Sequence, residues 1–466
     1  MDKLKYLLRN IGFLALGSFS IKLFGFILIP LYTNVLSAYE YGIYDLVSMT
    51  VSLLTPIATA NIADSTLRFA LDKRNNEKDV FSVSIKYYVI GFFVVGTLAA
   101  FNYIFNIIPA IREFSIFLLL IYLVSALANI MSVFARGMEC VKESSVSGAL
   151  GAVATIILNI VFLVPLKLGL DGYFLASILG LSVQAAYLAV KLKLWNYVSK
   201  SSWKQGLDAE MINFSRPLIA NNAAWWVNNS SDRYVVSYFC GIDANGIYSV
   251  GYKIPSLLNV LQTIVQQAWM LSAVKEYERE DKAGFFSRAY NAYNGMMVMV
   301  CALLIAVNKP LAHFLYAKEF YQAWKYVPYL SIGFVFMAMA NFMGGIFQAV
   351  NATKIIAAST LAGAAVNAAL DIAMTPFMGP AGAALATSIS YFTVWAYRAA
   401  AVRPFICLKL DMARNLLVYA VLYLQAVFNI YYPVRYLNCV IIIGLCMIYK
   451  HEIAETARLA GKLLKK

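Results

Sequence analysis

The sequence consists of long apolar runs that recur along its whole length and are separated by short polar segments. A helix needs about 20 mostly apolar residues to cross a bilayer, and inside lipid only helices and closed barrels satisfy every backbone polar group. We therefore expect an all-α polytopic membrane protein with about 14 transmembrane helices. The expected spans are 12–35, 42–65, 84–108, 114–135, 145–166, 172–191, 214–240, 246–270, 291–308, 326–350, 355–377, 380–400, 412–431 and 434–449.

The composition agrees with lipid as the solvent of this chain. Of its 466 residues, 61% are hydrophobic and 13% are charged, whereas soluble domains average about 25% charged residues. The first apolar segment follows a basic stretch and contains Lys22 and Pro30 without a clear cleavage site. We interpret it as a retained first span rather than a signal peptide, and the chain as a membrane protein rather than a soluble enzyme.

Motifs for metal binding and covalent catalysis are absent from the sequence. The two histidines, His313 and His451, are far apart, and no HExxH, GxSxG or phosphate-binding glycine loop occurs. The six cysteines form no CxxC pair; they are Cys140, Cys240, Cys301, Cys407, Cys439 and Cys446. The sequence therefore predicts no metal site, no disulfide and no cofactor.

The basic residues predict the orientation in the membrane. With the N-terminus in the cytoplasm, 28 of the 38 Lys and Arg residues lie in cytoplasmic segments and six in outer segments. Cytoplasmic loops carry such an excess of Lys and Arg, so we expect both termini in the cytoplasm and the protein in the cytoplasmic membrane. The net charge of +14 follows from this topology, and we expect no nucleic-acid partner.

The chain also repeats itself. Gly42-Ile43-Tyr44 recurs as Gly246-Ile247-Tyr248, Asn159 as Asn367, and Gly172 as Gly382, with an offset that rises from 204 to 210 residues. This predicts two parallel six-helix lobes, residues 1–200 and 201–405, followed by two further helices and a basic tail, 406–466. Parallel repeats are a common plan of transporters; the alternative is a duplicated helical scaffold that transports nothing.

Polar residues follow helical spacing in the second and eighth spans. Asp45, Ser48, Ser52, Thr55 and Thr59 share a face, and the same offset of 204 leads to Ser249, Tyr252, Ser256, Asn259 and Thr263, followed by Gln266. Polar side chains in spans avoid lipid, so we expect both stripes to face a shared aqueous cavity. The alternative is hydrogen bonding between packed helices.

Further polar and charged residues lie in other spans. The seventh span carries two adjacent polar rows at helical spacing, and in the eleventh span Thr360, Asn367 and Asp371 share a face. The residues assigned to a substrate-binding cavity are Lys22, Asp45, Asn229, Asp232, Arg233, Lys253, Asn367 and Asp371. The cations suit a phosphate ligand; the alternative is internal ion pairing, for example between Arg233 and an acid of another span.

Several stretches resemble the polysaccharide-biosynthesis (O-antigen/oligosaccharide) flippase family of the multidrug/oligosaccharidyl-lipid/polysaccharide exporter superfamily. They are LIPLYTNVLSAYEYGIYDLV (28–47), SDRYVVSYFCGIDANGIYSV (231–250) and GPAGAALATSIS (379–390). The resemblance implies translocation of an undecaprenyl-pyrophosphate-linked oligosaccharide by alternating access, with Arg233 and Lys22 as candidate partners of the pyrophosphate. It also implies membrane lipids as surroundings, coupling to H⁺ or Na⁺, and polymerase and glycosyltransferases of the same pathway as partners.

Two other functions stay open at this point. A multidrug/toxin cation antiporter of the same superfamily would use carboxylates such as Asp45 and Asp371 as the dominant cavity charges. An enzyme acting on lipid-linked sugars would need a sizeable outer domain, and the longest outer loop, about 309–325, is short.

Overall fold

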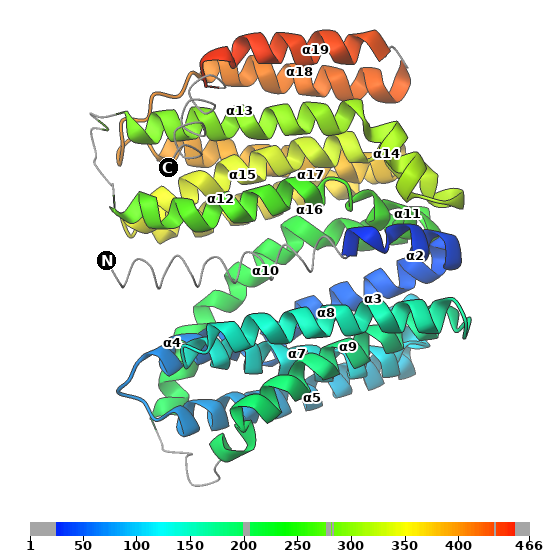
Figure 1. The fold of residues 1–466 in the computed structure, drawn as a ribbon, viewed down its shortest axis with the longest axis vertical. Coiled ribbons are helices and arrows are strands. Elements are labelled where there is room, and N and C mark those ends of the chain that lie inside the picture. Colours follow the sequence, from blue (N-terminus) through cyan, green and yellow to red (C-terminus); the bar gives the residue numbers. More distant parts are fainter. Residues whose placement is uncertain (1–24, 199–205, 276–280, 282–283, 433–434, 453–466) are drawn as a thin grey trace, which may run out of the picture. The chain divides into compact units, whose positions relative to one another are not determined.

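The computed structural model describes residues 25–198, 206–275, 281, 284–432 and 435–452. The chain forms two compact units, residues 1–226 and 227–466, and each is described by itself. In the described residues all regular structure is helical (Figure 1). The predicted all-α fold class is confirmed.

Unit 1 contains the helices up to the first half of α10. They are α2 (Ile29–Val35), α3 (Ala38–Ala58), α4 (Ile62–Leu71), α5 (Glu77–Phe105), α6 (Pro109–Arg112), α7 (Ser115–Gly137), α8 (Val141–Leu163), α9 (Gly169–Leu192), the 3-10 helix η1 (Leu194–Tyr197) and α10 (Leu207–Cys240). Local sequence fixes several of these starts. Ser37 and Glu40 form a capping box at α3, and the Asn76 side chain accepts a hydrogen bond from Lys78 N at the start of α5.

Unit 2 contains the second half of α10 and all later helices. These are α11 (Ile242–Gly251), α12 (Ser256–Lys275), α13 (Phe285–Ala306), α14 (Asn308–Leu315), the 3-10 helix η3 (Lys318–Lys325), α15 (Val327–Ala349), α16 (Thr353–Met378), α17 (Pro380–Ala401), α18 (Met412–Tyr431) and α19 (Arg435–Ile448). Gly379, at a φ of 62°, separates α16 from α17, and Pro380 occupies the first position of α17.

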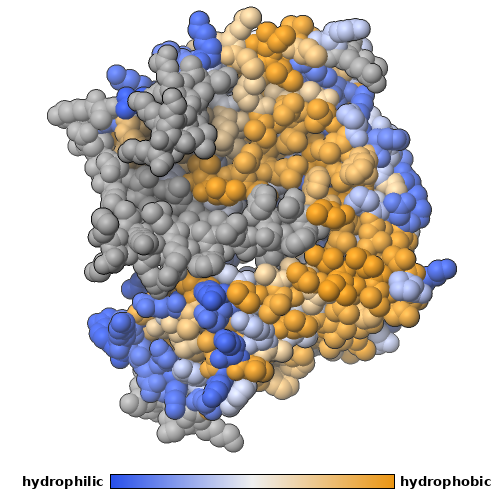
Figure 2. Space-filling model, viewed as in Figure 1, coloured by the Kyte–Doolittle hydropathy of each residue, from blue (hydrophilic) through white to orange (hydrophobic). Residues whose placement is uncertain are grey.

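The predicted spans coincide with these helices, the first of them only in its described part. Among the described residues eight helices are long and apolar enough to cross a membrane, and the α3–α4 pair, bent by 56°, makes a ninth. The other spans correspond to the more polar helices α10, α11–α12 and α17 and to the shorter apolar helices Gly25–Val35 and Tyr436–Ile448. In Figure 2 apolar side chains cover much of the visible surface over the helices, as expected for surfaces that face lipid.

The two units repeat one packing pattern. In unit 1, α7 packs against α4, α5, α8 and α9, and α8 packs against α9. In unit 2, α15 packs in the same way against α12, α13, α16 and α17, and α16 packs against α17. The repeated packing supports the duplication found in the sequence; the lobe boundaries at residues 200 and 405 stay a prediction.

The final two helices pack onto unit 2 along α13 (Figure 1). The helix α18 also contacts α15. In the most apolar 18-residue stretch of α15, 94% of the residues are buried, against 39% in the equivalent stretch of α7.

At each broken span a side chain donates a hydrogen bond to a backbone carbonyl near the break. At the α3–α4 break, Ala60 and Asn61 adopt positive φ, and the Ser215 hydroxyl donates to Ala60 O at 2.7 Å. At the α11–α12 break, the Tyr316 hydroxyl donates to Val250 O at 3.1 Å. Such partners are required because lipid offers unpaired carbonyls no hydrogen bonds.

Candidate functional site

The second half of α10 carries four polar residues that point into unit 2. Asn228 donates from Nδ2 to Thr360 O at 3.0 Å and accepts from Ser390 Oγ at 2.8 Å. Asn229 accepts at Oδ1 from the Tyr391 hydroxyl at 2.5 Å. One helical turn later come Asp232 and Arg233, so all four lie on the side of α10 that faces α16 and α17.

Asp232 is the centre of a buried hydrogen-bond network and is 1% exposed. Its Oδ2 accepts from the hydroxyl of Tyr248 at 2.7 Å, from that of Tyr252, and from Thr387 Oγ1 at 3.3 Å. Its Oδ1 accepts from Arg233 N at 2.9 Å. Charge-assisted hydrogen bonds of this number hold a carboxylate in one orientation.

Arg233 lies inside the same cluster and is 7% exposed. Its NH1 is 3.3 Å from Asp232 Oδ1 and donates to Asn229 O at 2.8 Å. Its guanidinium lies 4.4 Å from the centre of the Tyr252 ring, in cation–π contact. Arg233 thus forms an ion pair with Asp232, its neighbour in the sequence.

Asp371 on α16 is fully buried near Asp232 and interacts with it electrostatically. The Asn367 amide nitrogen, one turn earlier, faces Asp371 Oδ2 at 3.3 Å and Val227 O at 3.0 Å. Asp371 Oδ1 and Thr375 Oγ1 have no hydrogen-bond partner among the described residues. We call Asp232, Arg233, Asp371 and their hydrogen-bond partners the carboxylate cluster.

The structure brings five of the eight predicted site residues into this cluster: Asn229, Asp232, Arg233, Asn367 and Asp371. Asp45 lies half-buried on α3 in unit 1, and Lys253 lies half-buried in the turn between α11 and α12, directly after Tyr252. Lys22 lies outside the described residues. The assignment of all eight to substrate binding stays a prediction.

One of the two predicted polar stripes does not lie on a single helix. Asp45, Ser48, Ser52 and Thr55 all belong to α3, and Thr59 is its C-terminal cap. The second stripe is interrupted because the chain turns at 252–255, just before α12, where Pro255 lacks a backbone donor. Ser249 therefore belongs to α11, while Asn259, Thr263 and Gln266 belong to α12.

Three functional-site neighbours were missed in the sequence. Thr387, Tyr391 and Arg398 lie at helical spacing on α17, and all are buried. Arg398 was counted among cytoplasmic cations, but the structure buries it, with NH1 donating to Ala340 O at 2.8 Å and Nε to Ser359 Oγ at 2.9 Å. The same search for polar residues at helical spacing that was applied to the seventh span would have found Thr387, Tyr391 and Arg398 on the twelfth.

The two repeats differ at the acids. The offsets of 204, 208 and 210 pair Tyr248 with Tyr44, Asn367 with Asn159 and Thr387 with Ser177. At the positions of Asp232 and Asp371, unit 1 has Leu28 and Leu163. In unit 1 the Tyr44 and Ser177 hydroxyls form a hydrogen bond to each other at 2.8 Å. A scaffold of tyrosine, asparagine and hydroxyl groups is thus shared, and the carboxylates belong to unit 2.

The chemistry of the carboxylate cluster is that of a site for a small cation. It offers carboxylate, amide and hydroxyl oxygens, which hard cations prefer. No group of three or more His, Cys, Asp or Glu side chains that could hold a metal occurs within the described parts of the chain. Asp232 pairs with Arg233, and Asp371 adds a second carboxyl group near Asp232. With both carboxyl groups ionised, these three side chains carry a net charge of −1.

The fold is that of a multi-pass helical membrane protein. The family model of polysaccharide biosynthesis proteins matches residues 7–270. The chain belongs to the polysaccharide biosynthesis protein family. A search of curated proteins gives no significant match.

Solved structures with the same fold are transporters of the MOP superfamily. A lipid II flippase, MurJ, in an inward closed conformation has a TM-score of 0.68 at 13% identity, and the match covers 94% of this chain and 99% of that chain. An inward-facing multidrug MATE transporter also has a TM-score of 0.68, at 12% identity, with 84% of this chain and 98% of that chain covered. A transporter from Pyrococcus furiosus, whose binding pocket is described as reversed in polarity, has a TM-score of 0.60 at 13% identity, covering 91% and 96%.

Proposed function

We propose that the protein is a flippase that moves an undecaprenyl-pyrophosphate-linked oligosaccharide from the cytoplasmic to the outer leaflet of the cytoplasmic membrane by alternating access. The observation that carries the proposal is the family match over residues 7–270. The fold shared with a lipid II flippase supports it. In this role glycosyltransferases supply the substrate and a polymerase consumes the product, in cell-surface polysaccharide biosynthesis.

We further propose that the carboxylate cluster is the coupling site of this flippase and takes up H⁺ or Na⁺. A buried carboxylate without a counter-charge costs several kcal/mol, and Asp371 Oδ1 accepts no hydrogen bond from the described residues. A bound proton or sodium ion removes this cost. Arg233 supports the cluster through Asp232 and Tyr252, and its burial fits this role better than direct contact with a pyrophosphate.

Reconstituted vesicles test the flippase proposal. The purified protein is placed in liposomes that contain a lipid-linked oligosaccharide, and an impermeant glycosidase reports the glycan on the outer surface. We expect an imposed H⁺ or Na⁺ gradient to expose more glycan than in protein-free vesicles. Equal exposure with and without protein, under both gradients, contradicts the proposal.

The second candidate function is a multidrug/toxin cation antiporter, and the excess of carboxylate over guanidinium in the cluster favours it. The same vesicles loaded with a fluorescent lipophilic cation separate the two candidates. Gradient-driven efflux of the dye without glycan exposure supports the antiporter, and glycan exposure without dye efflux supports the flippase.

A further inference from the structure

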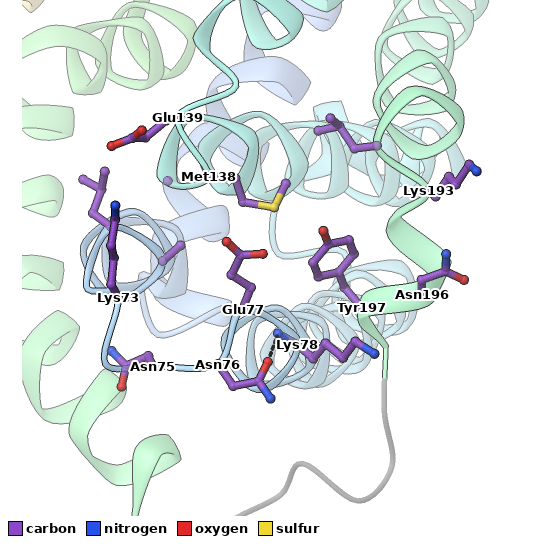
Figure 3. Close-up of a pocket in the computed structure, with 14 residues that line it drawn as sticks. Lys73, Asn75, Asn76, Glu77, Lys78, Met138, Glu139, Lys193, Asn196 and Tyr197 are labelled. Carbon is purple, nitrogen blue, oxygen red and sulfur yellow. Dashed lines mark hydrogen bonds between the residues drawn. The ribbon is translucent and has the colours of Figure 1, made fainter.

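A pocket of about 730 Å³ opens in unit 1 where several helices end. Its walls are the end of α4, the start of α5, the turn between α7 and α8, and the end of α9 with η1 (Figure 3). It lies outside the carboxylate cluster, which belongs to unit 2. Its charged and polar lining residues are Lys73, Asn75, Asn76, Glu77, Lys78, Glu139, Lys193, Asn196 and Tyr197.

The pocket lining carries both signs of charge, with Glu77 and Glu139 as acids and Lys73, Lys78 and Lys193 as bases. In Figure 3 the Glu77 carboxylate and the Tyr197 ring lie between the α5 start and the α7–α8 turn, while Lys73 and Lys193 lie on opposite sides. The Glu77 carboxylate acts electrostatically on the Tyr197 hydroxyl. Burial and the Glu77 charge raise the pKa of Tyr197, which keeps its hydroxyl protonated and able to donate a hydrogen bond.

The walls of the pocket are held by local contacts. Asn76 caps α5 by accepting from Lys78 N at 3.0 Å, and the Ser82 hydroxyl donates to Tyr197 O at 3.0 Å. The Tyr197 ring packs edge-on against Phe134 at 5.5 Å. The carboxylate and the phenol therefore stand on fixed backbone rather than on a free loop.

All the helix ends that line the pocket are ends that the basic residues assign to the cytoplasmic side. Beside the pocket Trp195 and Val198 are 58% and 53% exposed, and Leu71 in its wall is 51% exposed. Exposed tryptophan next to lysines is typical of the membrane–water interface. A ligand that reaches this pocket from the bilayer has its headgroup at this depth.

We propose that this pocket binds a phosphoethanolamine headgroup, in which a phosphate and a primary ammonium are joined by a short chain. The lysines are natural partners of the phosphate. Glu77 and the Tyr197 hydroxyl, away from Lys73 and Lys193, suit the ammonium, which donates three hydrogen bonds. A purely anionic headgroup would use the lysines but would leave the Glu77 carboxylate without a cationic partner from the ligand. The proposal does not rest on the flippase function.

Native mass spectrometry of the full-length protein in detergent tests the proposal by titration with phosphatidylethanolamine, phosphatidylcholine and phosphatidylglycerol. We expect phosphatidylethanolamine to bind most tightly, because the quaternary ammonium of phosphatidylcholine donates no hydrogen bond. Glu77→Gln should weaken phosphatidylethanolamine about tenfold, the loss of one charge-assisted hydrogen bond. Lys78→Ala should weaken phosphatidylethanolamine and phosphatidylglycerol alike.

Matched variants outside the pocket are the controls. Glu113→Gln removes an exposed acid of the same unit, and Lys191→Ala removes a lysine of α9 that does not line the pocket; both should bind as the unaltered protein does. Thermal unfolding midpoints identify any pocket variant that fails to fold. In that case Tyr197→Phe, which keeps the aromatic ring and removes only the hydroxyl, takes the place of that variant in the titration. The phosphoethanolamine group could belong to a lipid or to a soluble molecule, and free O-phosphoethanolamine as competitor separates the two. If it displaces phosphatidylethanolamine at equal concentration, the ligand is a soluble molecule of this chemistry; if it does not, the ligand is the lipid. Equal binding of phosphatidylcholine, or unchanged binding by Glu77→Gln, overturns the proposal.

Discussion

Asp371 shows at the scale of one residue what the carboxylate cluster requires. Its side chain is fully buried, and one of its oxygens accepts no hydrogen bond from the described residues. A cation that binds only the folded protein stabilises it by about 2.7 kcal/mol at a concentration of 100 times its Kd. We expect the unfolding midpoint of the purified protein to rise with Na⁺ or with H⁺, and Asp371→Asn to abolish this rise.

The Asp371→Asn variant should also be at least as stable as the unaltered protein without added cation, because it no longer buries an unpaired charge. Asp243→Asn, which changes an exposed acid at the start of α11, is the control and should keep the cation response. A cation response that survives Asp371→Asn would assign the binding to another site.

The two repeats provide a matched pair of tyrosines. Tyr248→Phe removes a hydroxyl that donates to Asp232, whereas Tyr44→Phe removes the equivalent hydroxyl that bonds to Ser177. Loss of a hydrogen bond to a buried charge costs about 1.5–3 kcal/mol, against about 0.5–1.5 kcal/mol for a neutral pair. We expect Tyr248→Phe to lower both stability and cation affinity, and Tyr44→Phe to lower stability alone; calorimetric titration and thermal unfolding measure the two effects. Equal cation affinities of the two variants would contradict this assignment.

Part of the candidate site was predictable from sequence. Helical spacing places Asp232 and Arg233 on the polar side of one span, and Asn367 and Asp371 on that of another, since a helix fixes which of its own residues share a face. Which faces meet depends on tertiary packing, which spacing does not encode. Spacing alone would have found the polar row of Thr387 on the twelfth span, but not that this row meets Asp232.

At the scale of elements, α18 runs along α13 with a nearly constant sequence offset. Tyr419 bonds to Asn294, Gln425 to Ala302 O and Asn429 to Ile305 O, at separations of 125, 123 and 124 residues. A constant offset means that the two helices run in the same direction. Spans 9 and 13 of the predicted topology have this relation.

Asn294 is the centre of this contact, because it also donates to Asn415 Oδ1 at 3.0 Å and to the Tyr449 hydroxyl at 3.1 Å. We expect Asn294→Leu to lower the free energy of unfolding by about 1–3 kcal/mol, since it leaves buried polar partners unsatisfied. Leu416→Ala, at a side chain that is 45% exposed, should change it far less. Thermal unfolding of the purified variants measures both; equal midpoints for the two variants would mean that the α13–α18 contact depends on apolar packing instead.

The helix breaks show which element features a hydropathy pattern leaves out. The second and eighth spans are continuous in hydropathy, yet each is broken: α3 ends at Ala58 and α11 at Gly251. Pro56 and Pro255 are present in the sequence, but a proline inside an apolar run fits a kinked span as well as a break. The contacts that satisfy the broken backbone, from Ser215 and Tyr316, come from residues distant in sequence.

At the scale of the whole molecule, the topology is the prediction with the widest consequences. The orientation rests on 28 Lys and Arg residues in cytoplasmic segments, and moving Arg398 into α17 leaves that bias in place. Residues 72–76 follow the second predicted span and residues 318–325 follow the ninth. The seven spans between them are an odd number, so the two segments must lie on opposite sides of the membrane.

Two exposed positions test this in a variant without the six native cysteines. Arg74, whose side chain is 89% exposed, lies in the first segment, and Gln322 is exposed in the second. In intact cells an impermeant maleimide should label Gln322→Cys and should reach Arg74→Cys only after permeabilisation, since the lysine-rich segment faces the cytoplasm. The reverse pattern would invert the orientation and place the Glu77–Tyr197 pocket at the outer surface. Labelling of both positions in intact cells would instead mean that the number of spans between them is even, and one of the polar helices α10 or α11–α12 would then not cross the membrane.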